Sequence, residues 1–208
     1  MSWSPLAQKL PRAFYSRPTL RVARDLLGKY LVRRIGRSIF VGKIVEVEAY
    51  CGSIDPASHA FKGKTPRNAV MFTRAGHLYV YFTYGMYFCA NVVTERTGKA
   101  GAVLLRAVEP LQGVSRMITN RNKRNGVKPR KAITGRFLTN GPAKLCQAFG
   151  IGKEENGADL LGIEIYVTRG TPVRHSEVER SKRIGIRVGR DKKWRFFLKN
   201  NRWVSKAL

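Results

Sequence analysis

The segment that most constrains the fold is an uncharged, aromatic stretch, "YVYFTYGMYFCANV", at residues 79–92. Aromatic and β-branched residues, which favour strands, lie on both sides of Gly85. Glycine permits the positive φ that a tight turn requires. We therefore expect two antiparallel strands, residues 77–82 and 86–93, joined at "TYGM".

The two faces of this hairpin differ in chemistry. Side chains alternate between the faces of a strand, so one face collects polar-tipped side chains and the other collects apolar ones. Tyr84 stands beside the turn glycine and is expected to protrude. The polar-tipped face is expected to hold Tyr79, Tyr81, Tyr87, Cys89 and Asn91, and the core face Leu78, Val80, Phe82, Phe88 and Val92.

The remaining patterns predict one domain, residues 1–208, of the α+β class. Its sheet is expected to be mixed, mainly antiparallel and curved, with flanking helices and the protruding hairpin. Residues 1–16 are a candidate for a flexible N-terminal extension. Apolar spacing, turn residues and β-branched runs predict helices at 18–27, from 110 onward and at 142–149, loops at 52–68 and 120–131, and strands at 29–35, 38–52, 100–110, 163–170, 183–189 and 195–200.

The charge of the chain restricts its partners. The chain has 40 Lys and Arg against 13 Asp and Glu, a formal net charge of +27, so its surface must attract polyanions. Nucleic acid is the first candidate and an anionic membrane surface is the second. No run of about 18 apolar residues and no signal peptide is found, which favours a cytoplasmic, nucleoid-associated protein, or a nuclear one in a eukaryote.

Cysteine and histidine spacing does not indicate a metal site. Cys51, Cys89 and Cys146 are odd in number and far apart, which argues against a disulfide framework and a zinc knuckle. The three histidines, His59, His77 and His175, are equally scattered. We expect no metal and no cofactor.

Two acids lie two positions apart in the strand "IVEVEAY". Alternation places Glu46 and Glu48 on one face, together with Ile44 and Tyr50. One interpretation is a solvated strand face balanced by cations, and the other is a general base beside a cleft. Arg106, a lone cation within an apolar strand, needs a partner if it is buried, and Glu48 is the natural one.

Five strings in order, "KIVEVEAY", "SHAFKGKTPRNAVMF", "GHLYVYFTYGMYFCANV", "AVLLRAVEPL" and "GPAKLCQAF", resemble the alkyladenine (3-methyladenine) DNA glycosylase family. The resemblance runs from about residue 20 to "WVS" at 203–205. It implies a monofunctional enzyme that starts base excision repair. Its partner would be double-stranded DNA containing damaged purines, namely 3-methyladenine, 7-methylguanine, hypoxanthine or ethenoadenine. The enzyme, a monomer, would flip the damaged nucleotide out of the duplex and release the base by hydrolysis of the N-glycosidic bond.

The resemblance also implies roles for individual residues. Glu48 would be the general base that activates a water, and Arg106 with the backbone carbonyl of Ile184 would hold that water. Glu46 is assigned a structural role only. Tyr50, His59, Tyr81, Cys89 and Asn91 would form the base pocket, Tyr84 and Met86 would intercalate into DNA, and Lys62, Lys64, Arg67 and Asn68 would contact its backbone.

Two other functions remain open from composition. A non-catalytic RNA-binding or ribosome-associated protein would explain the charge equally well, but it has no need of an acid inside a basic site. A nuclease would need a cluster of Asp and Glu for Mg²⁺, and the sequence offers none. The pairing of Glu48 with Arg106 beside an aromatic hairpin therefore favours the glycosylase.

Overall fold

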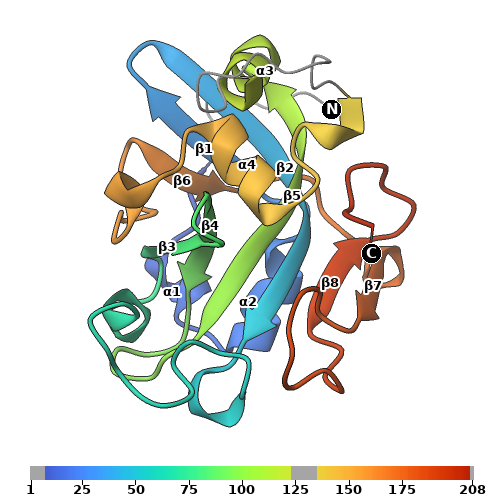
Figure 1. The fold of residues 1–208 in the computed structure, drawn as a ribbon. Helices are drawn as coiled ribbons and strands as arrows, with labels where there is room; N and C mark the ends of the chain where they lie inside the picture. Colours follow the sequence, from blue (N-terminus) through green and yellow to red (C-terminus); the bar gives the residue numbers. More distant parts are fainter. Residues whose placement is uncertain (1–7, 123–134, 207–208) are drawn as a thin grey trace.

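The computed structural model describes residues 8–122 and 135–206 and shows a curled sheet flanked by helices (Figure 1). Six strands follow one another in the order β3-β4-β5-β2-β1-β6, while β8 joins β2 and carries β7. Every strand pair in the described part of the chain is antiparallel. The strands are β1 (Tyr30–Ile35), β2 (Ser38–Tyr50), β3 (Leu78–Thr83), β4 (Tyr87–Val93), β5 (Ala102–Gln112), β6 (Ile165–Thr168), β7 (Val178–Ser181) and β8 (Arg195–Leu198).

The long strand β2 organises the sheet. One of its edges pairs with β5 along most of its length. The other edge pairs first with β1, over residues 38–43, and then with β8, over residues 46–48. The change of partner coincides with register shifts around Glu46 in the pairing of β2 with β5. Such irregularities bend a strand and re-aim its side chains, and they are common beside active sites.

Helices pack on the sheet and share its main core. Val22 and Leu26 of α2 and Leu145 and Phe149 of α4 are fully buried in one cluster with residues of β2 and β5. Helix α4 ends at Gly150, whose φ of 61° provides a left-handed cap. The helices are α1 (Arg12–Tyr15), α2 (Thr19–Leu26), α3 (Val114–Asn122) and α4 (Pro142–Phe149), with short 3-10 turns at Gly52–Ile54, Ala69–Phe72, Gly135–Phe137, Lys153–Glu155 and His175–Glu177.

The aromatic segment forms the expected hairpin. Its strands β3 and β4 pair from Leu78↔Val92 to Thr83↔Tyr87. Tyr84 and Gly85 at the turn have φ values of 52° and 63°. The tip projects, since Tyr84 is 79% exposed. The predicted fold class, α+β with a curved, mainly antiparallel sheet and a protruding hairpin, is confirmed.

Three details of the sequence prediction are wrong. Residues 183–189 form no strand, because Arg183 turns inward to bind Asp55 and the positive φ values of Gly185 and Gly189 break the extended chain. The helix expected from Pro110 begins at Val114, because pairing with β2 carries β5 to Gln112. Phe82, assigned to the core, is 50% exposed, because it lies toward the projecting tip of the hairpin, where its ring contacts that of Phe88.

Part of the candidate N-terminal extension packs against the body. Leu10 is buried, and its backbone N–H donates to the carbonyl of Val167. Tyr15 of α1 is buried completely. The basic loop predicted at 120–131 is helical up to residue 122, and residues 123–131 lie outside the described residues. Within the described ranges, no helix has the length and apolar character needed to cross a membrane.

Candidate active site

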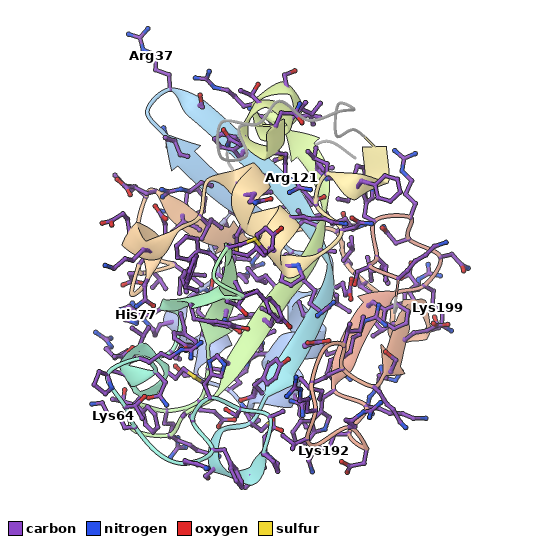
Figure 2. The ribbon with its side chains drawn as sticks, viewed as in Figure 1. Arg37, Lys64, His77, Arg121, Lys192 and Lys199 are labelled. Carbon is purple, nitrogen blue, oxygen red and sulfur yellow. The ribbon has the colours of Figure 1, made fainter. Side chains whose placement is uncertain are left out.

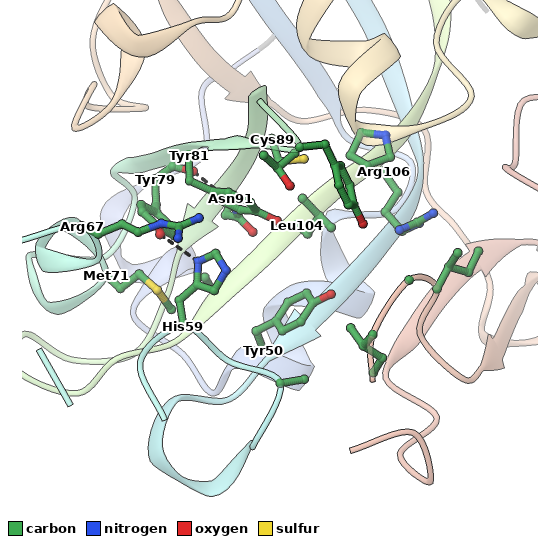
Figure 3. Close-up of a pocket in the computed structure, with 18 residues that line it drawn as sticks. Tyr50, His59, Arg67, Met71, Tyr79, Tyr81, Cys89, Asn91, Leu104 and Arg106 are labelled. Carbon is green, nitrogen blue, oxygen red and sulfur yellow. Dashed lines mark hydrogen bonds between the residues drawn. The ribbon is translucent and has the colours of Figure 1, made fainter. Parts of the chain in front are cut away.

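A pocket of about 380 Å³ opens between the hairpin, the loop that follows β2 and the segment that follows β7. This volume falls within the range of about 300–1,000 Å³ that is usual for small-molecule sites. Figure 3 shows Tyr50 and His59 projecting into it from the β2 side, and Tyr81, Cys89 and Asn91 from the hairpin. The structure thus gathers all five residues predicted for the base pocket around one cavity.

Glu48 lies directly behind the wall of this pocket. The side chain is fully buried. Its Oε1 accepts the backbone N–H of Ile184 at 2.7 Å and lies 3.3 Å from Nη1 of Arg106, while its Oε2 accepts the hydroxyl of Tyr50 at 2.9 Å. All three partners line the cavity. The interpretation of a solvated strand face is therefore wrong, and the predicted pairing of Glu48 with Arg106 is confirmed.

The contacts of Glu48 leave room for one more donor. A carboxylate offers about four acceptor positions. Two donors approach Oε1, whereas among the described residues only Tyr50 donates to Oε2. The contacts with Arg106, Ile184 and Tyr50 hold the carboxyl group in a fixed orientation at the pocket wall. One acceptor position on Oε2 is not used by any described residue.

Tyr50 is clamped between the acid and a cation. The guanidinium of Arg183 lies 4.6 Å from the centre of the Tyr50 ring, within range for a cation–π interaction. Arg183 in turn makes a two-pronged ion pair with the buried carboxylate of Asp55, at 2.5 and 2.7 Å. Burial is the main cause that raises the pKa of Tyr50, followed by the charge of Glu48. The tyrosine therefore stays a hydrogen-bond donor.

The facing wall is a cluster of three rings. The His59 ring meets the Tyr81 ring edge-on, with 4.5 Å between centroids, and its Nδ1 lies 2.9 Å from the hydroxyl of Tyr79. Although the pocket leaves His59 accessible to solvent, partial burial of its ring, followed by the charge of Arg67, lowers its pKa. Rings arranged in this way offer flat faces and edges against which a heterocycle can stack.

The base of the hairpin supplies two smaller lining residues. Asn91 is buried, and its Nδ2 donates to the carbonyl of Tyr79 at 3.1 Å, which fixes its amide. Cys89 is also buried, and burial is the main cause that raises the pKa of its thiol. Both residues therefore present neutral groups to the cavity.

The residues predicted to contact DNA are exposed, with one exception, and two of them, Arg67 and Tyr84, line the pocket. Tyr84 and Met86 at the hairpin tip are 79% and 56% exposed, and Lys62, Lys64 and Arg67 are exposed on the adjacent loop. Asn68 differs, because it is 1% exposed and its Nδ2 donates to the carbonyls of His59 and Gly63. Its side chain shapes the loop instead of facing a phosphate.

Sequence reasoning did not identify several residues of the site. Asp55 and Arg183 carried no signal, since they are 128 positions apart. Arg67 was assigned to the DNA backbone, but it also lines the pocket. Tyr79 was placed on the correct face of the hairpin. Its hydrogen bond to His59 could not be predicted, because His59 lies on a loop whose path follows no sequence periodicity.

Comparisons with known proteins agree on one family. A sequence profile described as methylpurine-DNA glycosylase matches residues 13–202. A protein of Carboxydothermus hydrogenoformans named "Putative 3-methyladenine DNA glycosylase" is 50% identical over 95% of this chain and 98% of its own length. Proteins with the same name from Burkholderia lata and Clostridium perfringens are 47% and 45% identical, over 94% and 95% of this chain and 90% and 99% of their own lengths.

Proposed function

The chain belongs to the methylpurine-DNA glycosylase family and is thus an enzyme of DNA repair, and from this premise we propose that it hydrolyses the N-glycosidic bond of alkylated or deaminated purines extruded from duplex DNA. The observation that carries the proposal is the buried carboxylate of Glu48, held between Arg106, Tyr50 and Ile184 at the wall of a ring-lined pocket. A binding protein without catalysis would gain nothing from such an acid.

In the proposed reaction Glu48 accepts a proton from a water that attacks C1′ of the sugar. The oxygen forms a bond to C1′ while the bond from C1′ to the base breaks, and the base leaves with the electron pair. Arg106 and the backbone carbonyl of Ile184 would hold the water, and both residues already line the cavity beside Glu48. With water as nucleophile, the sugar–phosphate backbone stays intact and the product is an abasic site.

The pocket also supports a purine substrate with a damaged base. Methylated purines are electron-poor and stack well on electron-rich rings, and Tyr50, His59 and Tyr81 present such rings to the cavity. We assign to Asn91 discrimination against normal guanine, whose 2-amino group would meet the fixed amide. 7-Methylguanine carries the same group, and its cationic ring, which stacks more strongly and leaves more readily, would offset that contact. The proposed substrates are 3-methyladenine, 7-methylguanine, hypoxanthine and ethenoadenine.

The hairpin tip and the surrounding cations would engage the duplex. Tyr84 projects from the tip and would enter the gap left by the extruded nucleotide, with Met86 beside it. Lys62, Lys64 and Arg67 would neutralise phosphates next to the pocket. Because one chain supplies every residue of the site, the proposed functional unit is a monomer acting on chromosomal DNA.

The decisive test replaces the proposed base. Glu48→Gln keeps the shape of the side chain but cannot take up a proton, so the single-turnover rate of excision should fall by about 10²–10⁴-fold. Duplexes containing hypoxanthine or ethenoadenine serve as substrates, and alkaline cleavage reveals the abasic product. The affinity of the variant for the same duplexes should stay within a few-fold of the wild-type value.

Glu179→Gln is the matched control, because Glu179 is an exposed glutamate on β7, away from the pocket. This variant should excise at the wild-type rate. Full turnover by Glu48→Gln would remove Glu48 from the role of base. Failure of the wild-type protein to release any of the four bases would contradict the proposed function as a whole.

A further inference from the structure

A second buried acid, Glu46, lies on β2 two residues before Glu48. It does not line the pocket, and its side chain is fully buried. Its Oε1 accepts three donors: Nε of Arg106 at 2.8 Å, Nε of Arg195 at 2.7 Å and the hydroxyl of Ser205 at 2.7 Å. Its Oε2 accepts the backbone N–H of Ser205 at 2.6 Å. Buried charges with this many partners are costly to assemble and hold a fixed geometry.

Ser205 connects this acid to the pocket. Its hydroxyl donates to Glu46 and can at the same time accept Nη2 of Arg106, which lies 3.3 Å away. Its backbone carbonyl accepts Nη2 of Arg195 at 2.8 Å. One serine thus touches both cations and the acid, through its side chain and through both of its backbone polar groups.

As a result, all three nitrogens of the Arg106 guanidinium have a separate partner. Nε binds Glu46, Nη2 binds Ser205 and Nη1 approaches Glu48 at 3.3 Å. A planar guanidinium has a rigid arrangement of donors, so fixing two nitrogens determines where the third points. Here the two fixed nitrogens direct Nη1 at Oε1 of Glu48.

We propose that Glu46 and Ser205 form a cradle that orients the guanidinium of Arg106 toward the carboxyl group of Glu48. Ser205, through its hydroxyl, would then be a positioning residue for base excision. The proposal rests on the function proposed above. The charge state of the cradle agrees with it: burial alone would raise the pKa of Glu46, but Arg106, Arg195 and Ser205 outweigh burial, so the net shift is downward and the acid stays ionised.

Removing the hydroxyl should weaken the hold on Glu48. In Ser205→Ala the backbone N–H still reaches Glu46, but Nη2 of Arg106 loses its acceptor and the ring of contacts opens on the Arg106 side. Arg106 can then rotate about its remaining bond to Glu46, and Nη1 moves relative to Glu48. The carboxyl group of Glu48 is then held less firmly as a consequence. The charged and titratable groups that face Glu48 are Arg106 on β5, Tyr50 on β2, Arg183 in the segment after β7, Tyr81 on β3 and Cys89 on β4.

The first measurement compares the single-turnover rate of excision with the affinity for the lesion duplex. Ser205→Ala should be slower by about 10-fold, as expected for one lost hydrogen bond to a charged group. Its affinity for the lesion duplex should be unchanged. Ser181→Ala is the matched control, because it removes a hydroxyl that binds Arg195 at 3.0 Å without touching Arg106. It should leave both the rate and the affinity at wild-type values.

A double-mutant cycle separates positioning from general loss of stability. In an Arg106→Ala background, Ser205→Ala should slow excision by less than 2-fold, because there is no guanidinium left to orient. An equal loss in both backgrounds, or a loss of duplex affinity that accounts for the slower rate, would overturn the proposal. A fall in melting temperature by itself would not support it.

A readout without turnover tells failure of the cradle from failure of the proposed function. The Nη2–H protons of Arg106, which the Ser205 hydroxyl accepts and which are assigned by their absence in Arg106→Lys, should exchange slowly with solvent in the wild-type protein. Ser205→Ala should speed that exchange by at least about 10-fold, on the scale of one lost charged hydrogen bond, and Ser181→Ala should not. If exchange behaves in this way while the wild-type protein releases no base, the cradle stands and the enzymatic proposal falls. If exchange in Ser205→Ala is unchanged, the cradle falls.

Discussion

The surroundings of His59 shift the pKa of its ring downward. Partial burial of its ring and the Arg67 guanidinium lower its pKa from the usual 6.5. We therefore expect the ring to stay neutral on acidification through pH 6.5 and to gain its proton only at lower pH. A protonated ring would add a cation to a pocket that already holds Arg67 and Arg106, so excision of the cationic 7-methylguanine should fall in that lower range.

Ring NMR of His59 measures this directly. Its titration midpoint should lie below 6.5 in the wild-type protein and rise toward 6.5 in Arg67→Ala, because one of the two causes is removed. Lys64→Ala, which removes an exposed cation from the same loop, should leave the midpoint in place. A wild-type midpoint at or above 6.5 would show that the environment of His59 has been misjudged.

At the same scale, sequence reasoning singled out both acids but could predict a partner only for Glu48. Alternation along β2 drew attention to Glu46 and Glu48, and family resemblance singled out Glu48. The register shifts around Glu46 arise in the pairing of β2 with β5, and its contacts with Ser205 join positions 159 apart. No local pattern reports such a contact, so Glu46 could be assigned a structural role but not a partner.

The hairpin β3–β4 places a bulky residue in a strained conformation. Tyr84 has a φ of 52°, a left-handed value that costs a residue with a side chain about 1–2 kcal/mol. Strain of this kind is retained where function requires it. Tyr84→Gly should relieve the strain, offset in part by about 0.5–1 kcal/mol of backbone entropy. The melting temperature should then stay equal or rise.

The same change should weaken binding to a lesion duplex by about 1–3 kcal/mol, because the stacking ring is gone. Tyr84→Phe keeps the ring and should retain wild-type affinity in a fluorescence anisotropy titration. Equal affinity of all three proteins would show that the tip does not enter the duplex.

Elements with strong local signals were predicted well, and those set by distant contacts were not. Helix α4 was predicted at its observed bounds, since a proline at its start and a glycine after its end mark both termini. The hairpin followed from Gly85 and its aromatic flanks. Residues 183–189 alternate like a strand, but the buried pair of Arg183 with Asp55 holds them in another path. Tertiary contacts overrode the pattern there.

The charge of the whole molecule makes its DNA affinity dependent on salt. The formal net charge is +27, and Figure 2 shows Arg37, Lys64, Lys192 and Lys199 projecting outward from separate parts of the chain. Counterion release predicts a linear fall of log K with log salt, with a slope of about −0.9 for each phosphate neutralised. Measured at constant pH, affinity for undamaged duplex should therefore fall steeply between about 50 and 200 mM salt.

Single substitutions locate the docking face. Lys64→Ala, on the loop that also holds the pocket residues His59 and Arg67, should reduce the magnitude of the slope by about 1. Arg37→Ala, at the exposed turn between β1 and β2, should leave the slope unchanged, because Figure 2 shows Arg37 at the opposite end of the molecule from Lys64. A flat salt response would argue against electrostatic docking, and equal effects of the two variants would argue against this face.

The edge of β2 that pairs with both β1 and β8 has a consequence for the order of folding. Its first half pairs with β1 across a short turn. Its second half pairs with β8, which is distant in sequence, since Arg195 of β8 lies 149 positions from Glu46. Pairings between distant parts of a chain form slowly, since a large loop must close first. A nascent or refolding chain in which only the local strand pairs have formed would therefore contain Glu48 and Arg106 before β8 and the residues after it are in place beside them. Such an intermediate should not excise bases from DNA until the sheet is complete.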